Sequence, residues 1–167
     1  MSEFAPSRFH GASGRNVVVC SDNKIKIIND GGQEIAEYDL KEDKILASTA
    51  FGDFVVVSFS GDVSAKGSEL GVLDIGAINA EKDTISERFD HDGNNNDSIF
   101  KWDRRLEGFI EAIGSMEDSF IFSLKGLGIY SMGISRNGKE IEINENWRLG
   151  YPEWNGKMAA GFVDGVA

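Results

Sequence analysis

Three stretches of the chain share one order of hydrophobic and polar positions. In each, a pair of small or apolar residues precedes a short turn, and the turn precedes a run of large apolar residues that ends in serine. The runs of large residues are 17–21, 54–58 and 120–123, and the pairs before them are Ala12-Ser13, Ala47-Ser48 and Ala112-Ile113. A fourth copy begins at Met158-Ala159-Ala160-Gly161-Phe162-Val163. Self-similarity of this kind predicts a protein built from repeats.

Behind each apolar run lie two further candidate strands joined by a polar turn. In the first copy the strands are 24–28 and 33–40, and in the second they are 71–75 and 84–89. In the third copy, 128–132 and 140–143 flank the turn Arg136-Asn137-Gly138-Lys139. Apolar and polar residues alternate with a period of two in 36–40, as in a half-buried strand, and Asn-Gly is a strong hairpin signal.

Four strands per unit, ordered as small, large, amphipathic and polar, resemble the blade of a β-propeller. Trp102-Asp103 is similar to the Trp-Asp pair of WD repeats. The resemblance covers the whole chain and implies one all-β domain, 1–167, of four-stranded antiparallel blades. The expected blades are 8–40, 44–90 and 106–146, with an insertion at 91–105 and the start of a further blade at 157–167.

The composition agrees with many short strands and tight turns. The 167 residues include 20 glycines, 11 phenylalanines and only 2 prolines, and so many glycines disfavour long helices. Three blades and the start of a fourth do not close a ring, because propellers have at least four blades. We therefore expect an incomplete propeller, completed by more of a longer chain or by another copy.

One segment also fits a helix. Leu106, Phe109, Ile110 and Ile113 have the spacing of an amphipathic helix that Asp103 could cap, although Gly108 and Gly114 oppose it. A helix there is the alternative to the first strand of the third unit.

The net charge of −11 opposes direct binding to nucleic acid or to anionic lipid, both of which need a basic stripe. No apolar run approaches the roughly 20 residues that span a bilayer, so no membrane insertion is expected. The single cysteine, Cys20, ends an apolar run and is expected to be buried. The lack of cysteine pairs favours an intracellular protein, cytoplasmic or nuclear.

The densest group of polar side chains is the segment 90–97. Asp90, Asp92, Asn94 and Asp97 offer oxygen atoms at the alternate positions that Ca²⁺ prefers, and the segment resembles the calcium loops of some propeller repeats. Asn95 and Lys101 depart from the EF-hand pattern at its glycine and its bidentate glutamate. Either a calcium site or a solvated loop tip fits this composition. No other cofactor is indicated.

Tryptophan and arginine are the most frequent anchors of protein interfaces, and all three tryptophans lie beside charged or turn residues, with Trp147 directly before Arg148. Trp102 precedes Arg104 and Arg105, and Trp154 lies in a turn-rich segment. These four residues are the candidate partner-binding residues, and packing between outer strands is the alternative role for the tryptophans. The alternation from Ile99 onward favours a strand that either docks on a sheet or anchors a partner.

No catalytic motif is present. The two histidines, His10 and His91, lie in no nucleophile context, and no phosphate-binding glycine loop occurs. A repeat scaffold without converging reactive groups favours a non-enzymatic scaffold that presents loops to a protein partner. The alternative is a calcium-dependent hydrolase or carbohydrate-binding propeller that uses the loop 90–97.

Overall fold

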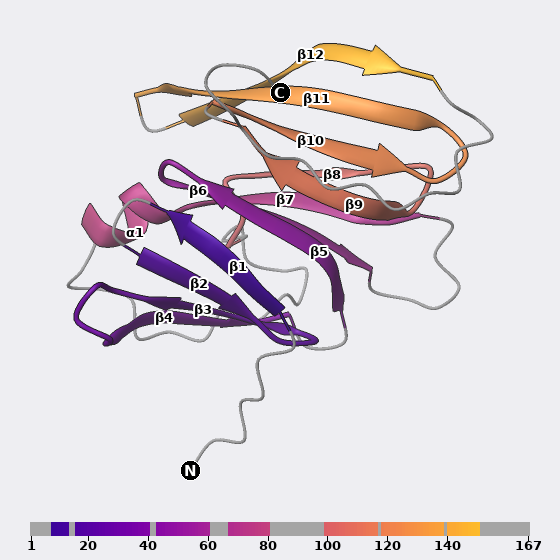
Figure 1. Ribbon diagram of the computed structural model, residues 1–167. Coiled ribbons are helices and arrows are strands. Elements are labelled where there is room, and N and C mark those ends of the chain that lie inside the picture. The colour runs from indigo at the N-terminus through magenta and orange to yellow at the C-terminus, as the bar shows by residue number, and fades with distance from the viewer. Residues whose placement is uncertain are drawn as a thin grey trace, which may run out of the picture.

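Figure 1 shows the computed structural model of the chain. The structure describes residues 8–13, 16–40, 43–60, 67–80, 99–116, 118–138 and 140–150, and for 8–13 and 78–80 it describes only the backbone. These residues form twelve strands and one short helix.

The strands make three antiparallel sheets of four, each from consecutive strands. In the first sheet these are β1 (Arg8–Ser13), β2 (Asn16–Cys20), β3 (Lys24–Ile28) and β4 (Glu34–Asp39). In the second they are β5 (Lys44–Phe51), β6 (Phe54–Ser60), β7 (Glu69–Asp74) and β8 (Trp102–Arg105), with helix α1 (Ile75–Ala80) following β7. In the third they are β9 (Ile110–Ser115), β10 (Ser119–Leu124), β11 (Gly128–Asn137) and β12 (Glu140–Leu149).

The first strands of the three sheets lie next to one another. β1 contacts β5, and β5 contacts β9, so β4, β8 and β12 become the outer strands of sheets that fan out from one side (Figure 1). The inner strand β5 carries buried Ala47 and Ser48, as expected where strands crowd together. The all-β architecture predicted from the apolar pattern is therefore confirmed.

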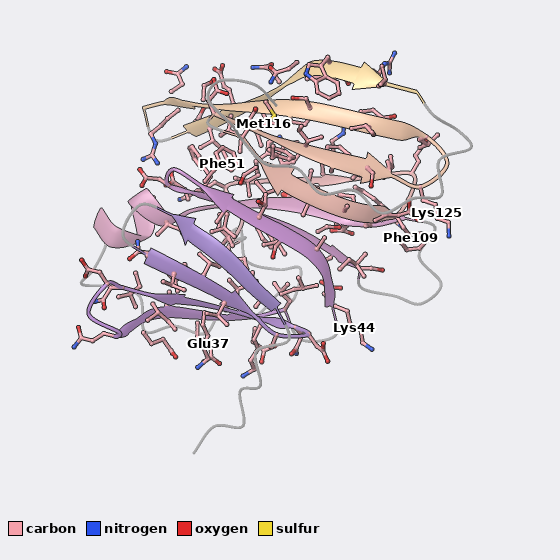
Figure 2. The ribbon with its side chains drawn as sticks, viewed as in Figure 1. Glu37, Lys44, Phe51, Phe109, Met116 and Lys125 are labelled. Atoms are coloured by element: carbon pink, nitrogen blue, oxygen red, sulfur yellow. The ribbon has the colours of Figure 1, made fainter. Side chains whose placement is uncertain are left out.

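Two apolar layers join the sheets face to face. Between the first and second sheets, Val18, Ile25 and Ile27 meet Val55 and Phe59. The second layer joins the second and third sheets, and Phe51 lies within it (Figure 2). The buried residues of this layer include Phe51, Val56, Leu70, Val72, Phe120, Phe122, Leu124, Met132 and Ile134.

The middle sheet explains why the second strand of a unit is apolar at successive positions. All five residues 55–59 are buried, because Val55 and Val57 face the first sheet while Val56 faces the third. In β2, which has a described sheet on one face only, buried and half-buried residues alternate. Burial at successive positions, as in β6, thus marks a strand covered on both faces, whereas the similar apolar run of β2 is buried only at alternate positions.

The structure differs from the expected units at the fourth strand of the second sheet. Residues 102–105, assigned above to an insertion at 91–105, form β8 and pair with β7. The segment 84–89, expected as that fourth strand, lies outside the described residues, as does the further unit at 157–167. Residues 110–115 form β9, so the helical alternative there is wrong.

The hairpin between β11 and β12 follows the predicted turn. Asn137 pairs with Glu140, and Gly138 between them has φ of 64°, a left-handed conformation that glycine adopts without strain. Within the part of the chain that the structure describes, no helix has the length and apolar character needed to cross a membrane.

Candidate interaction surface

Strand β8 forms the outer edge of the second sheet. It lies at the end of the order β5-β6-β7-β8 and pairs with β7 from Val72 and Trp102 to Glu69 and Arg105. Phe100, just before the strand, stacks on Phe59 at 5.0 Å between ring centroids. A Cβ atom at Gly71 would lie 2.5 Å from the Phe100 ring, so the glycine in β7 leaves the space that lets this ring dock.

The side chains of β8 differ in burial, with one packed on the sheet and the others exposed to solvent. Trp102 is half-buried and packs against the apolar layer between the second and third sheets. Arg104 and Arg105 are exposed, and no ion pair joins either of them to another side chain among the described residues. The predicted strand is confirmed, with Trp102 docked on the sheet and two exposed guanidinium groups beside it.

The outer strands of the other two sheets carry the opposite charge. β4 contains Glu34, Glu37 and Asp39 and no cation, and β12 contains three glutamates and one arginine, Arg148. In β8 two arginines accompany a single acidic residue, Asp103. Of the three outer strands that the structure describes, β8 is therefore the basic one in a chain of net charge −11.

On the first sheet, lysines of β3 neutralise the acidic outer strand. Lys26 Nζ lies 2.6 Å from Glu34 Oε2 and 2.6 Å from Glu37 Oε2, and Lys24 Nζ lies 2.9 Å from Glu37 Oε1. Hydrogen bonds from Lys26 and then Lys24 lower the pKa of Glu37 below its ordinary value. The hydrogen bond to Glu37 raises the pKa of Lys24, and the bonds to Glu34 and Glu37 raise that of Lys26.

Figure 2 shows Glu37 on the face of the first sheet that points away from the second sheet. This face carries ion-paired polar groups where the corresponding faces of the other sheets carry phenylalanine and valine. Its charges are satisfied within the sheet, which makes it a poor candidate for recognising a charged partner.

A second polar group joins the second and third sheets, and sequence reasoning missed it. Arg136 Nη2 on β11 donates to Asp74 Oδ1 at the end of β7 at 2.7 Å, and Asp74 is buried. Asp74 Oδ1 also accepts from the backbone N–H of Ala77, as a helix N-cap does. The guanidinium lies 5.5 Å from the centre of the Phe54 ring and 3.7 Å from Asp53 Oδ2.

The partners Arg136 and Asp74 are 62 positions apart in sequence. In the sequence, Asp74 lies near the end of an apolar run and Arg136 lies in the predicted hairpin turn, and neither position identifies a pair. Arg136 on the third sheet contacts a buried carboxylate and an aromatic ring of the second sheet, so the arrangement links the two sheets. It is a structural group and carries no free cation.

The other predicted site residues remain untested. Asp90, Asp92, Asn94 and Asp97 lie outside the described residues, and so does Trp154. Within the described ranges, no group of three or more His, Cys, Asp or Glu side chains could hold a metal ion. The calcium site in the loop 90–97 stays a prediction, which a calorimetric titration with Ca²⁺ and a rise in melting temperature on binding would test. Cys20 is buried, with Sγ 3.5 Å from Ser48 Oγ.

Comparison with known proteins places the fold. No protein-family model matches the sequence, and no curated protein matches it. Among solved structures, Hsv2p of Kluyveromyces lactis is similar with a TM-score of 0.52 and 16% identity, over 82% of this chain and 44% of that one. Hsv2 of Kluyveromyces marxianus is similar with a TM-score of 0.53 and 13% identity, over 81% and 42%. The β-propeller domain of Cps50 (Swd1) from Myceliophteria thermophila reaches 0.47 at 8% identity, over 84% and 38%.

The chain spans less than half the length of the Hsv2 proteins that it matches. The likeness shows the fold and nothing of the activity, because the identity is low. Three antiparallel sheets of four strands, each packed by its face on the next and with its first strand innermost, are consecutive blades of a β-propeller.

Proposed function

We propose that this chain is part of a β-propeller that acts as a non-enzymatic, intracellular scaffold and binds a protein partner through β8. The observation that carries the proposal is a pair of exposed arginines, Arg104 and Arg105, which have no ion pair with any described side chain and lie beside the anchored Trp102. Trp154, predicted for the same role, lies outside the described residues.

The chemistry of β8 suits a protein interface. Arginine and tryptophan are over-represented among the residues that dominate binding energy. A guanidinium group is weakly hydrated and presents five donors in a fixed plane, so it loses less on desolvation than an ammonium group does. Because Trp102 is already held by the sheet, a partner that covers it need not order a mobile side chain.

A closed propeller requires more blades than the described residues form. A propeller needs at least about four blades to close, and the described residues supply three sheets. We propose that the remaining blades come from another part of a longer protein or from a second copy of the chain. This requirement is separate from the binding of a partner at β8.

Affinity capture with variants of β8 tests the proposed function. The wild-type chain and the double variant Arg104→Glu/Arg105→Glu are immobilised and exposed to an extract of the source cells. Quantitative mass spectrometry should find a protein that the wild type retains in stoichiometric amounts and the variant loses by at least tenfold. Trp102→Ala should weaken the same capture by roughly tenfold or more, which corresponds to ~1.4 kcal/mol or more.

The matched control is Arg148→Glu, which reverses one exposed cation on the outer strand of the third sheet. It should capture the same protein as the wild type, and all variants should keep the wild-type circular dichroism spectrum. Retention of every captured protein by the double variant would contradict binding at β8.

A further inference from the structure

We infer that the free edge of β8 accepts an extended acidic peptide as an added strand; this rests on the proposed function and names the class of partner. The inference combines two features of one strand: backbone groups that point away from the sheet, and exposed cations that pair with no side chain in the described ranges.

The ladder between β7 and β8 determines which backbone groups are free. The N–H of Leu106, just after β8, donates to the carbonyl oxygen of Ser68 at 2.9 Å. In an antiparallel ladder, alternate residues direct both backbone groups to the same side. Arg104 therefore faces β7 with its backbone, while Asp103 and Arg105 direct theirs to the open edge. Within the part of the chain that the structure describes, nothing pairs with the two N–H groups and two carbonyl groups of Asp103 and Arg105, and an incoming strand can bind them.

The charge of this edge selects the partner. Lys101, Arg104 and Arg105 are exposed, and none of them has an ion pair among the described residues. Unpaired backbone at a sheet edge is a template for another strand, and edge charges decide which strands can approach. An acidic peptide is attracted here, whereas at the outer strands β4 and β12 it would meet mainly carboxylates.

The order of side chains along β8 defines the peptide further. Residues of an added strand lie opposite Trp102, Asp103, Arg104 and Arg105 in turn, and cross-strand pairs of opposite charge are favourable. The matching segment has an apolar residue, an uncharged or basic residue and then two adjacent acidic residues. In a parallel strand this order runs from the N-terminus to the C-terminus of the peptide, and in an antiparallel strand it runs from the C-terminus to the N-terminus.

Two blocked hexapeptides are the probes: Thr-Val-Thr-Glu-Glu-Thr and its reversed sequence. Each is titrated into the isotope-labelled chain, and backbone amide shifts are followed by NMR. One of the two should shift the amides of Asp103 and Arg105 most strongly. Its affinity should fall at least tenfold in Arg104→Gln/Arg105→Gln, fall with added salt, and stay unchanged in Arg148→Gln on β12.

A peptide with the same charges but N-methylated at the amides that face β8 separates strand addition from charge attraction alone. It should bind at least tenfold more weakly, because it cannot donate to the edge. Equal binding of the methylated peptide, equal binding of a peptide with lysine in place of glutamate, or no binding of either hexapeptide at millimolar concentration would overturn the inference.

Failure of this inference is distinguishable from failure of the proposed function. If neither peptide binds but the capture of a cellular protein still depends on Arg104 and Arg105, β8 remains the docking site and the peptide class is wrong. If the wild type instead self-associates and the Arg104→Gln/Arg105→Gln variant does not, the edge receives a second copy, and the acidic peptide is again the wrong occupant.

Discussion

At the scale of single residues, the ion pair between Arg136 and Asp74 links the third sheet to the second. Asp74 is 4% exposed, and a buried carboxylate is tolerated only with charge-assisted hydrogen bonds around it. The same aspartate caps helix α1 through Ala77. One buried oxygen atom therefore ties the third sheet to the second and starts the helix.

Replacing Arg136 by alanine should lower the free energy of unfolding by about 3 kcal/mol, since it leaves a buried charge without its partner. Denaturant unfolding measures the change. The control Arg148→Ala removes an arginine whose only described ion pair is 3.8 Å from Glu145 at the surface, and it should change stability by less than about 0.5 kcal/mol. If the two variants lower the free energy of unfolding equally, Arg136 does not stabilise the contact between the second and third sheets.

Individual residues also show which features the sequence predicts and which it does not. The runs 17–21, 54–58 and 120–123 lie within β2, β6 and β10 except at Ser21, which follows β2, because alternation and burial are local properties of a strand. The pairing of β8 with β7 joins Val72 to Trp102, thirty positions later in the sequence. The only local signal of this pairing is the short apolar stretch that leads into Trp102. The candidate residues Trp102, Arg104 and Arg105 could be named from composition, but not their place on an outer strand.

At the scale of elements, the three outer strands have different electrostatic roles. The acidic strand β4 is neutralised by two lysines of β3, whereas the basic strand β8 has no such partners among the described residues. Neutralisation inside the sheet lets β4 contribute to stability, and the charge of β8, which no described side chain neutralises, fits the recognition role proposed for it.

The ion pairs of β4 should make stability depend on pH. The pKa of Glu37 is lower in the folded chain than in the unfolded chain, so its contribution is present above the ordinary glutamate pKa and is lost as the pH falls through the lower, folded value. Glu37→Gln should lower stability at pH 7 by about 1 kcal/mol and lessen the loss in acid. Denaturant unfolding at pH 7 and at about pH 3 measures both, and an unchanged difference between these pH values would contradict the role of Glu37.

At the scale of the whole molecule, the described sheets form an open row of blades. The outer face of the third sheet carries Trp147 and Leu149, which are 44% and 46% exposed and lie opposite Ser131 and Ile129 in the ladder. Neither belongs to the two apolar layers. Large exposed apolar side chains beside each other are typical of surfaces that pack against another element.

We therefore expect the isolated 167-residue chain to self-associate as its concentration rises, and Trp147→Glu to reduce this association. Sedimentation velocity over a hundredfold range of concentration measures it. A monodisperse monomer with one cooperative melting transition at every concentration would contradict the expectation that further blades cover this face.

Binding through β8 is tested by hydrogen–deuterium exchange of the chain with and without the partner recovered by capture. A partner strand on β8 should slow exchange of the amides of Asp103 and Arg105 at least tenfold, because they become hydrogen-bonded donors. The amides of β4 and β12 should exchange as in the free chain. Protection confined to β4 or β12, with β8 unchanged, would contradict the claim that this propeller binds its partner through the basic outer strand of its second blade.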